Sequence, residues 1–149
     1  MSDEEIQAAY FPGTVPVSPD PTEAQLESLR FTDEGWESTT SGVVFVVAGG
    51  PERPEVEKLR LAKAIVARFA EVEADAKQVA RVFIRDEGSW SVEEVNAAKL
   101  ASANECDFLI RLSFSPADGS SKYGYTSFLV CFTVSSSSFR VRKYVVEFL

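Results

Sequence analysis

The sequence contains no histidine. Catalytic arrangements of the Ser-His-Asp and Cys-His types are therefore excluded, and so are zinc or iron sites with imidazole ligands. An enzyme with this sequence would have to use carboxylate, lysine, tyrosine or single-cysteine chemistry. Because no motif indicates such a chemistry, we expect a protein that is not an enzyme and that needs neither a cofactor nor a metal.

Cysteine is also scarce. Cys106 and Cys131 each lie within an apolar stretch, which predicts buried, reduced thiols that pack as small hydrophobic groups. Two isolated cysteines cannot form a four-thiolate zinc site. A disulfide between them stays open, because the sequence does not show whether their strands are neighbours.

Long apolar runs are missing. The longest candidate, Val43–Ala48, is far shorter than the roughly 20 residues that cross a membrane as a helix. The first residues, Met1–Glu5, lack the positive charge and the apolar segment of a signal peptide. We therefore expect a cytoplasmic protein without membrane contact, with one domain of ordinary size.

Positive charge is almost absent from the first quarter of the chain. Residues 1–40 contain nine acidic side chains and one base, Arg30, whereas residues 41–149 contain fourteen of each sign, so the net charge of −8 is local. An acidic region next to a neutral body favours either solubility or recognition of something basic. The isoelectric point near 4.6 argues against nucleic acid binding. We expect a protein partner with a basic surface.

The N-terminal part is predicted to be an arm followed by a domain. Residues 1–21 contain four prolines and little periodicity, which predicts an extended acidic arm, with residues 22–149 forming a single α+β domain. Asp20 and Pro21 are typical of a helix start, and this short helix should end near Arg30. A polar stretch over 32–42 then leads into a buried strand at Val43–Val47.

The middle of the chain has helical periodicity. Apolar residues recur every three or four positions from 51 to 86, which predicts one long amphipathic helix. A break near 73–77 and a separate strand at 81–85 are alternatives. The capping signature that begins at Ser91 predicts a second helix through about Ala101.

The C-terminal part alternates with a period of two. Cys106–Phe114, Tyr123–Val134 and Phe139–Leu149 are predicted to form an antiparallel meander. The apolar positions change parity near Lys143, which indicates a bulge there. The predicted fold class is thus α+β, with an antiparallel sheet of about four strands packed against a long amphipathic helix.

Gly49 and Gly50 follow a strand and precede a helix, which is the general arrangement of a phosphate-binding turn. The specific fingerprints of such turns are absent, and Glu52 and Glu55 place negative charge where a phosphate would lie. A simple strand-to-helix turn is the favoured interpretation.

The segments Asp33–Glu37 and Asp86–Glu94 each place carboxylates around a tryptophan, and together they predict the binding site. Interfaces combine aromatic anchors with complementary charge, so the predicted partner-binding residues are Asp33, Glu34, Trp36, Glu37 and Trp90. Alternatives are open: Trp36 could anchor its loop, Trp90 could fill the core, and the carboxylates near Trp90 could cap a helix or face water. Adjacency in sequence does not establish a catalytic carboxylate pair.

Basic residues gather near the other end of the chain. Arg140, Arg142 and Lys143 lie on the last predicted strand. Their positive charges could protect an edge strand from association with other sheets, or could pair with the acidic arm.

The C-terminal half resembles the small immunity-type proteins that accompany bacterial toxins. The residues that carry this resemblance are the long and the capped helices, the alternating strand at Asp107–Leu112 and the return strand at Tyr123–Phe128. The resemblance implies a non-catalytic protein that neutralises a cognate toxin, and it transfers no site residue. We expect an immunity or inhibitor protein, with a secretion or assembly chaperone as the alternative and a small histidine-independent enzyme as the third possibility.

Overall fold

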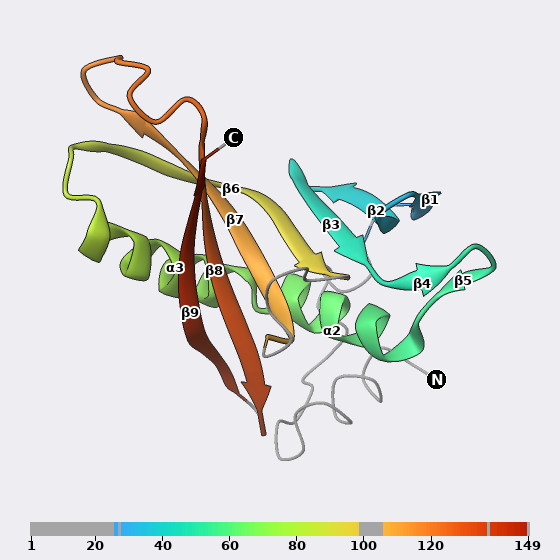
Figure 1. Ribbon diagram of the computed structural model, residues 1–149. Coiled ribbons are helices and arrows are strands. Elements are labelled where there is room, and N and C mark those ends of the chain that lie inside the picture. The colour runs from blue at the N-terminus through green and yellow to red at the C-terminus, as the bar shows by residue number, and fades with distance from the viewer. Residues whose placement is uncertain (1–25, 27, 99–105, 137, 149) are drawn as a thin grey trace.

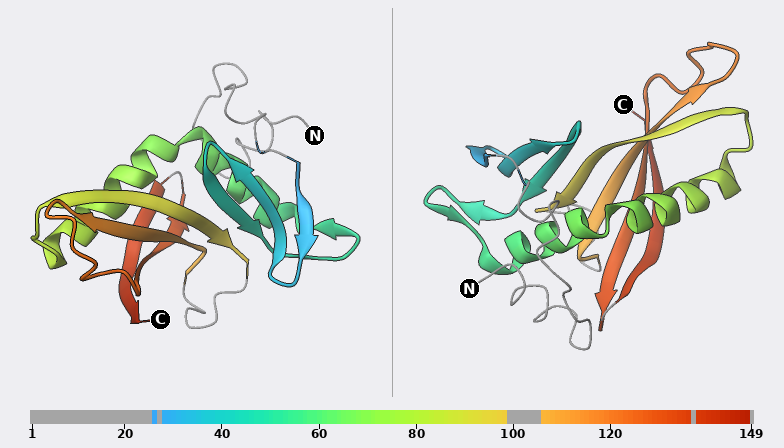
Figure 2. Two further views of the ribbon diagram at one scale, coloured as in Figure 1. Left: turned by 90° about the horizontal axis from the view of Figure 1, so that it is seen from above. Right: turned by 180° about the vertical axis from the view of Figure 1, so that it is seen from behind.

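The computed structural model describes residues 26, 28–98, 106–136 and 138–148. Seven strands form one sheet in the order β1-β2-β3-β6-β7-β8-β9, two further strands form a small separate pair, and two helices cover one face of the large sheet (Figures 1 and 2). The elements are β1 (Arg30–Thr32), β2 (Gly35–Thr40), β3 (Val43–Val47), β4 (Gly49–Gly50), β5 (Arg53–Pro54), α2 (Val56–Ala67), α3 (Phe69–Phe83), β6 (Gly88–Ala97), β7 (Phe108–Pro116), β8 (Thr126–Ser135) and β9 (Ser138–Phe148).

The predicted sheet of about four antiparallel strands against one long helix is wrong. The sheet has seven strands and is mixed, because β3 and β6 are parallel. The polar stretch over 32–42 contributes to the extra strands: β2 pairs with β1 and with β3. Ser41 and Gly42 both have positive φ, 52° and 79°, as a tight two-residue hairpin turn requires. Polar residues can form a strand here because the hairpin geometry and the neighbouring buried β3 determine the pairing.

The second predicted helix, Ser91–Ala101, is also wrong: its described part belongs to strand β6. Trp90, Val92, Val95 and Ala97 are buried on one face, with the register shifted by one residue at Glu93. This bulge interrupts the period of two, so the segment imitates a capped helix in sequence. Pairing with β3 and β7 overrides the local capping signature.

The long helix is divided into α2 and α3. The interruption falls at Arg68, with φ −118° and ψ 27°, and neither at 73–77 nor at a strand over 81–85. The guanidinium of Arg68 lies 4.5 Å from the ring centroid of Phe139 and 2.7 Å from a carboxylate oxygen of Glu71. The first helix begins at Val56, later than expected, because β5 pairs with β4 before it.

Several local predictions are confirmed. Val43–Val47 is the strand β3, and β7, β8 and β9 form the antiparallel meander. Phe132 pairs with Val141 and Cys131 with Lys143, so Arg142 is the extra residue of the predicted bulge. The expected helix end at Arg30 is incorrect, since Arg30 begins β1. The expected arm at 1–21 and the start of its helix at Asp20 lie outside the described residues.

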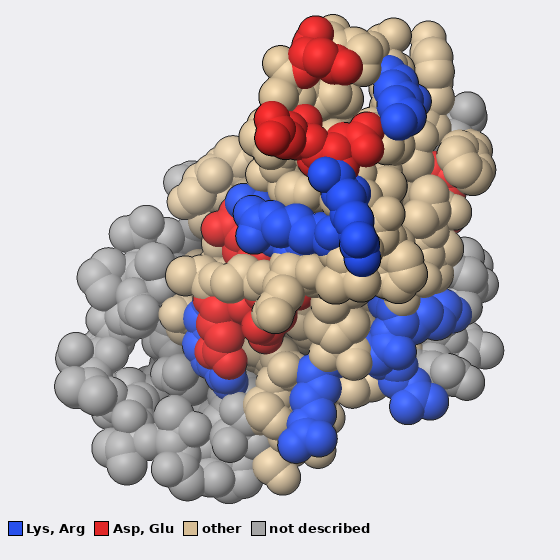
Figure 3. All heavy atoms as spheres, turned by 90° about the vertical axis from the view of Figure 1, so that its left-hand side faces the viewer, with Lys and Arg blue, Asp and Glu red and all other residues tan. Residues whose placement is uncertain are grey.

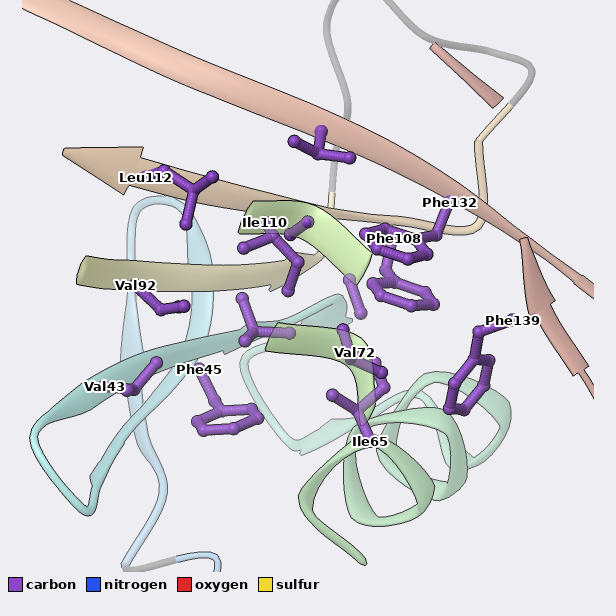
Figure 4. Packing of buried hydrophobic residues seen from close by; sticks show 14 of the residues in the cluster. Val43, Phe45, Ile65, Val72, Val92, Phe108, Ile110, Leu112, Phe132 and Phe139 are labelled. Atoms are coloured by element: carbon purple, nitrogen blue, oxygen red, sulfur yellow. The ribbon is translucent and has the colours of Figure 1, made fainter. Parts of the chain in front are cut away.

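The core lies between the sheet and the two helices. The parallel pair β3 and β6 is joined through α2 and α3, which places both helices on the same face. Figure 4 shows Phe45, Ile65, Val72, Phe108 and other apolar side chains pointing into the space between these layers. The rings of Phe108 and Phe132 stack there at 4.9 Å.

A second, smaller cluster lies on the opposite face of the sheet. Leu109, Leu129 and Cys131 are buried there, and Cys106 and Val145 pack against them. The two cysteines are not joined by a disulfide; Cys131 is buried and Cys106 is half-buried. Within the described part of the chain, neither helix is long and apolar enough to cross a membrane.

Candidate functional site

The first part of the predicted site is the turn between β1 and β2. The Glu34 backbone N–H donates to the Thr32 hydroxyl at 3.2 Å, and this hydroxyl donates to the Gly35 carbonyl at 3.0 Å. Gly35 has a φ of +135°, and a Cβ there would lie 2.6 Å from the backbone oxygen of Val47. The turn therefore requires glycine at this position, and it presents the exposed side chains of Asp33 and Glu34.

Trp36 fastens this hairpin to the neighbouring one. Its indole N–H donates to the Gly50 carbonyl at 2.9 Å, and its half-buried ring packs against the core. The ring of Phe31 lies 5.4 Å away and is 43 % exposed. Of these two rings the more accessible one is thus Phe31, which sequence reasoning missed. Its pairing with Trp36 depends on the β1–β2 hairpin, which was not predicted.

Glu37 and Glu94 lie on the sheet face opposite the helices. Their strand neighbours Trp36 and Val95 contribute to the helix-covered core, and side chains alternate along a strand. Strand β3 separates the two glutamates, and Arg111 pairs with Glu94 from β7. The sheet therefore places Glu94 near the predicted strip, although it comes from the second tryptophan segment.

The pKa of Glu94 reflects both its burial and the charges around it. Burial raises the pKa of Glu94 most; Arg111 and Asn96 oppose the shift, and the negative charges of Glu34 and Glu37 raise it further. Arg111 Nε lies 3.5 Å from Glu94 Oε2. Arg111 thus faces Glu94 from β7, and Arg30 lies directly opposite Glu37 on β1. We call Asp33, Glu34, Glu37 and Glu94 the acidic surface.

The bulge in β6 adds polar groups beside this surface. The Ser113 hydroxyl donates to Glu93 at 2.7 Å, and the hydroxyls of Ser91 and Ser113 are 2.9 Å apart. Glu93 and Ser91 are exposed. Among the described residues, no three His, Cys, Asp or Glu side chains are grouped so as to hold a metal ion. This arrangement of exposed acceptors can receive an ammonium or guanidinium group from a partner.

A hollow lies beside the β1–β2 hairpin. It measures about 670 Å³, lies open to solvent between the β4–β5 hairpin and the start of α2, and is lined by residues 50–57. Its charged lining residues are Glu52, Arg53, Glu55 and Glu57. Because Trp36 bonds to Gly50, the hollow is held beside the β1–β2 hairpin.

Trp90 lies apart from the acidic surface. It is 7 % exposed on the helix-covered face, 4.7 Å from the ring of Phe114 and 5.0 Å from that of Phe128. These contacts are those of a core residue. The structure therefore places Asp33, Glu34, Trp36 and Glu37 in one hairpin, but the ring of Trp36 lies on the helix-covered face and Glu37 on the opposite face. Trp90 lies in the core, apart from this hairpin.

One side of the molecule has mixed charge. On the side that carries α3 and β9, Lys and Arg side chains are interspersed with Asp and Glu side chains (Figure 3). Lys122, for example, lies 3.1 Å from Asp86. The predominance of one sign around Asp33, Glu34, Glu37 and Glu94 contrasts with this side.

Comparisons of the chain with known protein families, with characterised proteins and with solved structures found no match.

Proposed function

We propose that this chain binds a protein through its acidic surface and acts as an immunity or inhibitor protein that neutralises a cognate toxin. The observation that supports it best is that pairing through β3 puts Glu37 and Glu94 on the same face of the sheet, next to the exposed turn that carries Asp33 and Glu34. Two segments far apart in the chain thus contribute carboxylates to one face, where Arg30 is a neighbour of Glu37 and Arg111 a neighbour of Glu94. Such a surface attracts Lys and Arg side chains of a partner, and not nucleic acid, whose phosphates it repels.

The aromatic pair on the other face of the β1–β2 hairpin provides a contact of a different kind. Interfaces concentrate binding energy in a few aromatic residues, while charges accelerate the encounter. Phe31 is exposed, and Trp36 holds it in place from behind. In this proposal the acidic surface steers a basic partner, and Phe31 with Trp36 slows its dissociation.

The test begins by identifying the partner in the cell that makes this protein. Wild type, the Glu34→Gln/Glu37→Gln variant and an Asp75→Asn/Glu87→Gln control are used for affinity capture. The control loses the same charge from α3 and the α3–β6 connection. The captured protein is then expressed alone and together with this chain, and association rates are measured over a salt series.

The proposal expects a captured protein that is toxic alone and harmless in the presence of this chain. The Glu34→Gln/Glu37→Gln variant should associate more slowly and with a weaker salt dependence than both wild type and control. Equal rates for the two variants would contradict the role of the acidic surface. A harmless, secreted partner would instead support the chaperone alternative, and a turnover unaffected by these substitutions would support an enzyme.

A further inference from the structure

Strand β9 has a symmetric pattern on its helix-covered face. Because the bulge at Arg142 shifts the parity, two apolar residues before it and three after it point to the same side. Val146 shares this face with its strand neighbour Phe128, which belongs to the core. In chain order these residues are Phe139, Val141, Tyr144, Val146 and Phe148. The face therefore shows the same residue types from either end, with Tyr144 in the middle.

The same strand forms one edge of the sheet. It has 11 residues, whereas β1 at the other edge has 3. Phe148 is 83 % exposed and Val146 39 %, and Phe83, whose ring stacks on Tyr144 at 4.7 Å, is 63 % exposed. A long edge strand offers backbone groups for pairing, and clustered exposed apolar side chains indicate a contact surface.

We propose that two copies of this chain associate by antiparallel pairing of their β9 strands about a twofold axis beside Tyr144. If the bulge counts as one position, Phe148 of one copy lies opposite Phe139 of the second copy, and Val146 lies opposite Val141. A twofold interface must be complementary to itself, and the symmetric pattern of β9 meets this condition.

Charges on the other face of β9 fit the same register. Arg140 of each copy lies opposite Glu147 of the second copy, so the dimer contains this opposite-charge pair twice. Arg140, Arg142 and Lys143 would repel a strand with bases at these positions. The positive charges that protect this edge from unrelated strands are therefore compatible with pairing to a second copy of β9.

The proposed dimer does not depend on the proposed function. The acidic surface is built from the β1–β2 turn, β2 and β6, whereas β9 forms the far edge of the sheet. Pairing through β9 leaves Asp33, Glu34 and Glu37 available to a partner. An experiment that contradicts one proposal therefore does not contradict the other.

Sedimentation velocity of the full chain over a concentration series tests the dimer. The variants are Arg140→Glu, Glu147→Arg, their combination, Phe148→Ser and the control Glu87→Arg. Wild type and Glu87→Arg should form a dimer. Each single reversal should raise the dissociation constant roughly tenfold, because two attractive pairs become repulsive, and the combined exchange should restore it. Phe148→Ser should also weaken the dimer.

Thermal unfolding of each variant, followed by circular dichroism, shows whether the fold is intact. A wild-type chain that stays monomeric across the series overturns the proposal. So does a dimer that tolerates the single reversals, or one that the combined exchange fails to restore while the variants are folded.

Discussion

Glu94 Oε2 lies 3.5 Å from Arg111 Nε across strands β6 and β7, yet the pKa of Glu94 is raised. Burial therefore outweighs the attraction of the guanidinium, and the charges of Glu34 and Glu37 act in the same direction as burial. The ionised form of Glu94 costs free energy in the folded protein. A group of this kind is more often kept for recognition than for stability.

Glu94→Gln should remove a pH-dependent loss of stability. Because the folded pKa lies above the ordinary value of 4.5, the unfolded chain ionises first as pH rises. Wild type therefore loses stability from pH 4.5 up to the raised pKa and regains it as pH falls. Near neutral pH the variant should match wild type within about 1 kcal/mol or exceed it, since Arg111 stays partly solvated. Urea unfolding over a pH series measures this, and parallel curves for variant and wild type would disprove it.

Glu34→Gln/Glu37→Gln should lower the pKa of Glu94. The two substitutions remove negative charges that raise it and leave burial and Arg111 in place. An NMR titration of the Glu94 side-chain carboxyl carbon gives the pKa directly. Asp75→Asn/Glu87→Gln is the matched control and should have a smaller effect. If both double variants shift the pKa equally, the acidic surface is not electrostatically coupled.

Tyr144→Phe should stabilise the protein at high pH. Burial raises the pKa of Tyr144 from 10.0 to about 12, so the unfolded chain ionises first and wild type loses stability over this range. Among the described residues, its hydroxyl has no hydrogen-bond partner. At neutral pH we therefore expect phenylalanine to leave the free energy of unfolding unchanged or to raise it by about 1 kcal/mol.

Alkaline unfolding of Tyr144→Phe is compared with that of Tyr125→Phe, which removes the hydroxyl of a tyrosine that is 79 % exposed. Only the Tyr144 variant should lose the stability decrease between pH 10 and about 12. The same decrease in both variants would show that the Tyr144 hydroxyl is solvated.

Trp90→Ala should be among the most destabilising substitutions. It empties a site between the rings of Phe114 and Phe128, and removal of a buried aromatic side chain costs about 3–5 kcal/mol. Trp36→Phe, which removes only the bond to Gly50 and part of the ring, should cost about 1 kcal/mol. Chemical denaturation of both variants measures the difference. Similar small losses would place Trp90 outside the core.

Sequence reasoning worked best where hydrophobic periodicity is regular. The buried strand Val43–Val47 and the meander that ends in β9 follow from local patterns. It failed at β6, because one bulge at Glu93 disguised a strand as a helix start. It also missed the β1–β2 and β2–β3 hairpins, where Ser41 and Gly42 were the available turn signal.

The candidate site was predicted only in part, because sequence patterns group residues that are neighbours along the chain. Asp33, Glu34, Trp36 and Glu37 are close in sequence, so their proximity needed no tertiary information. Phe31 and Glu94 could not be added, because the first depends on an unrecognised hairpin and the second on the pairing of β6 with β3 and β7. Trp90 shares its segment with Glu94 but faces the other side of the sheet.

The sequence by itself determined the charge distribution, the lack of imidazole chemistry, and the local periodicities that place the bulge in β9. These properties belong to single residues or to neighbours along the chain. Only the tertiary structure decided that β3 and β6 are parallel neighbours, that Glu94 approaches Glu34 and Glu37, and that Trp90 is buried. The physical reason is that strand pairing joins segments far apart in the chain, and the face each side chain occupies depends on the register of that pairing.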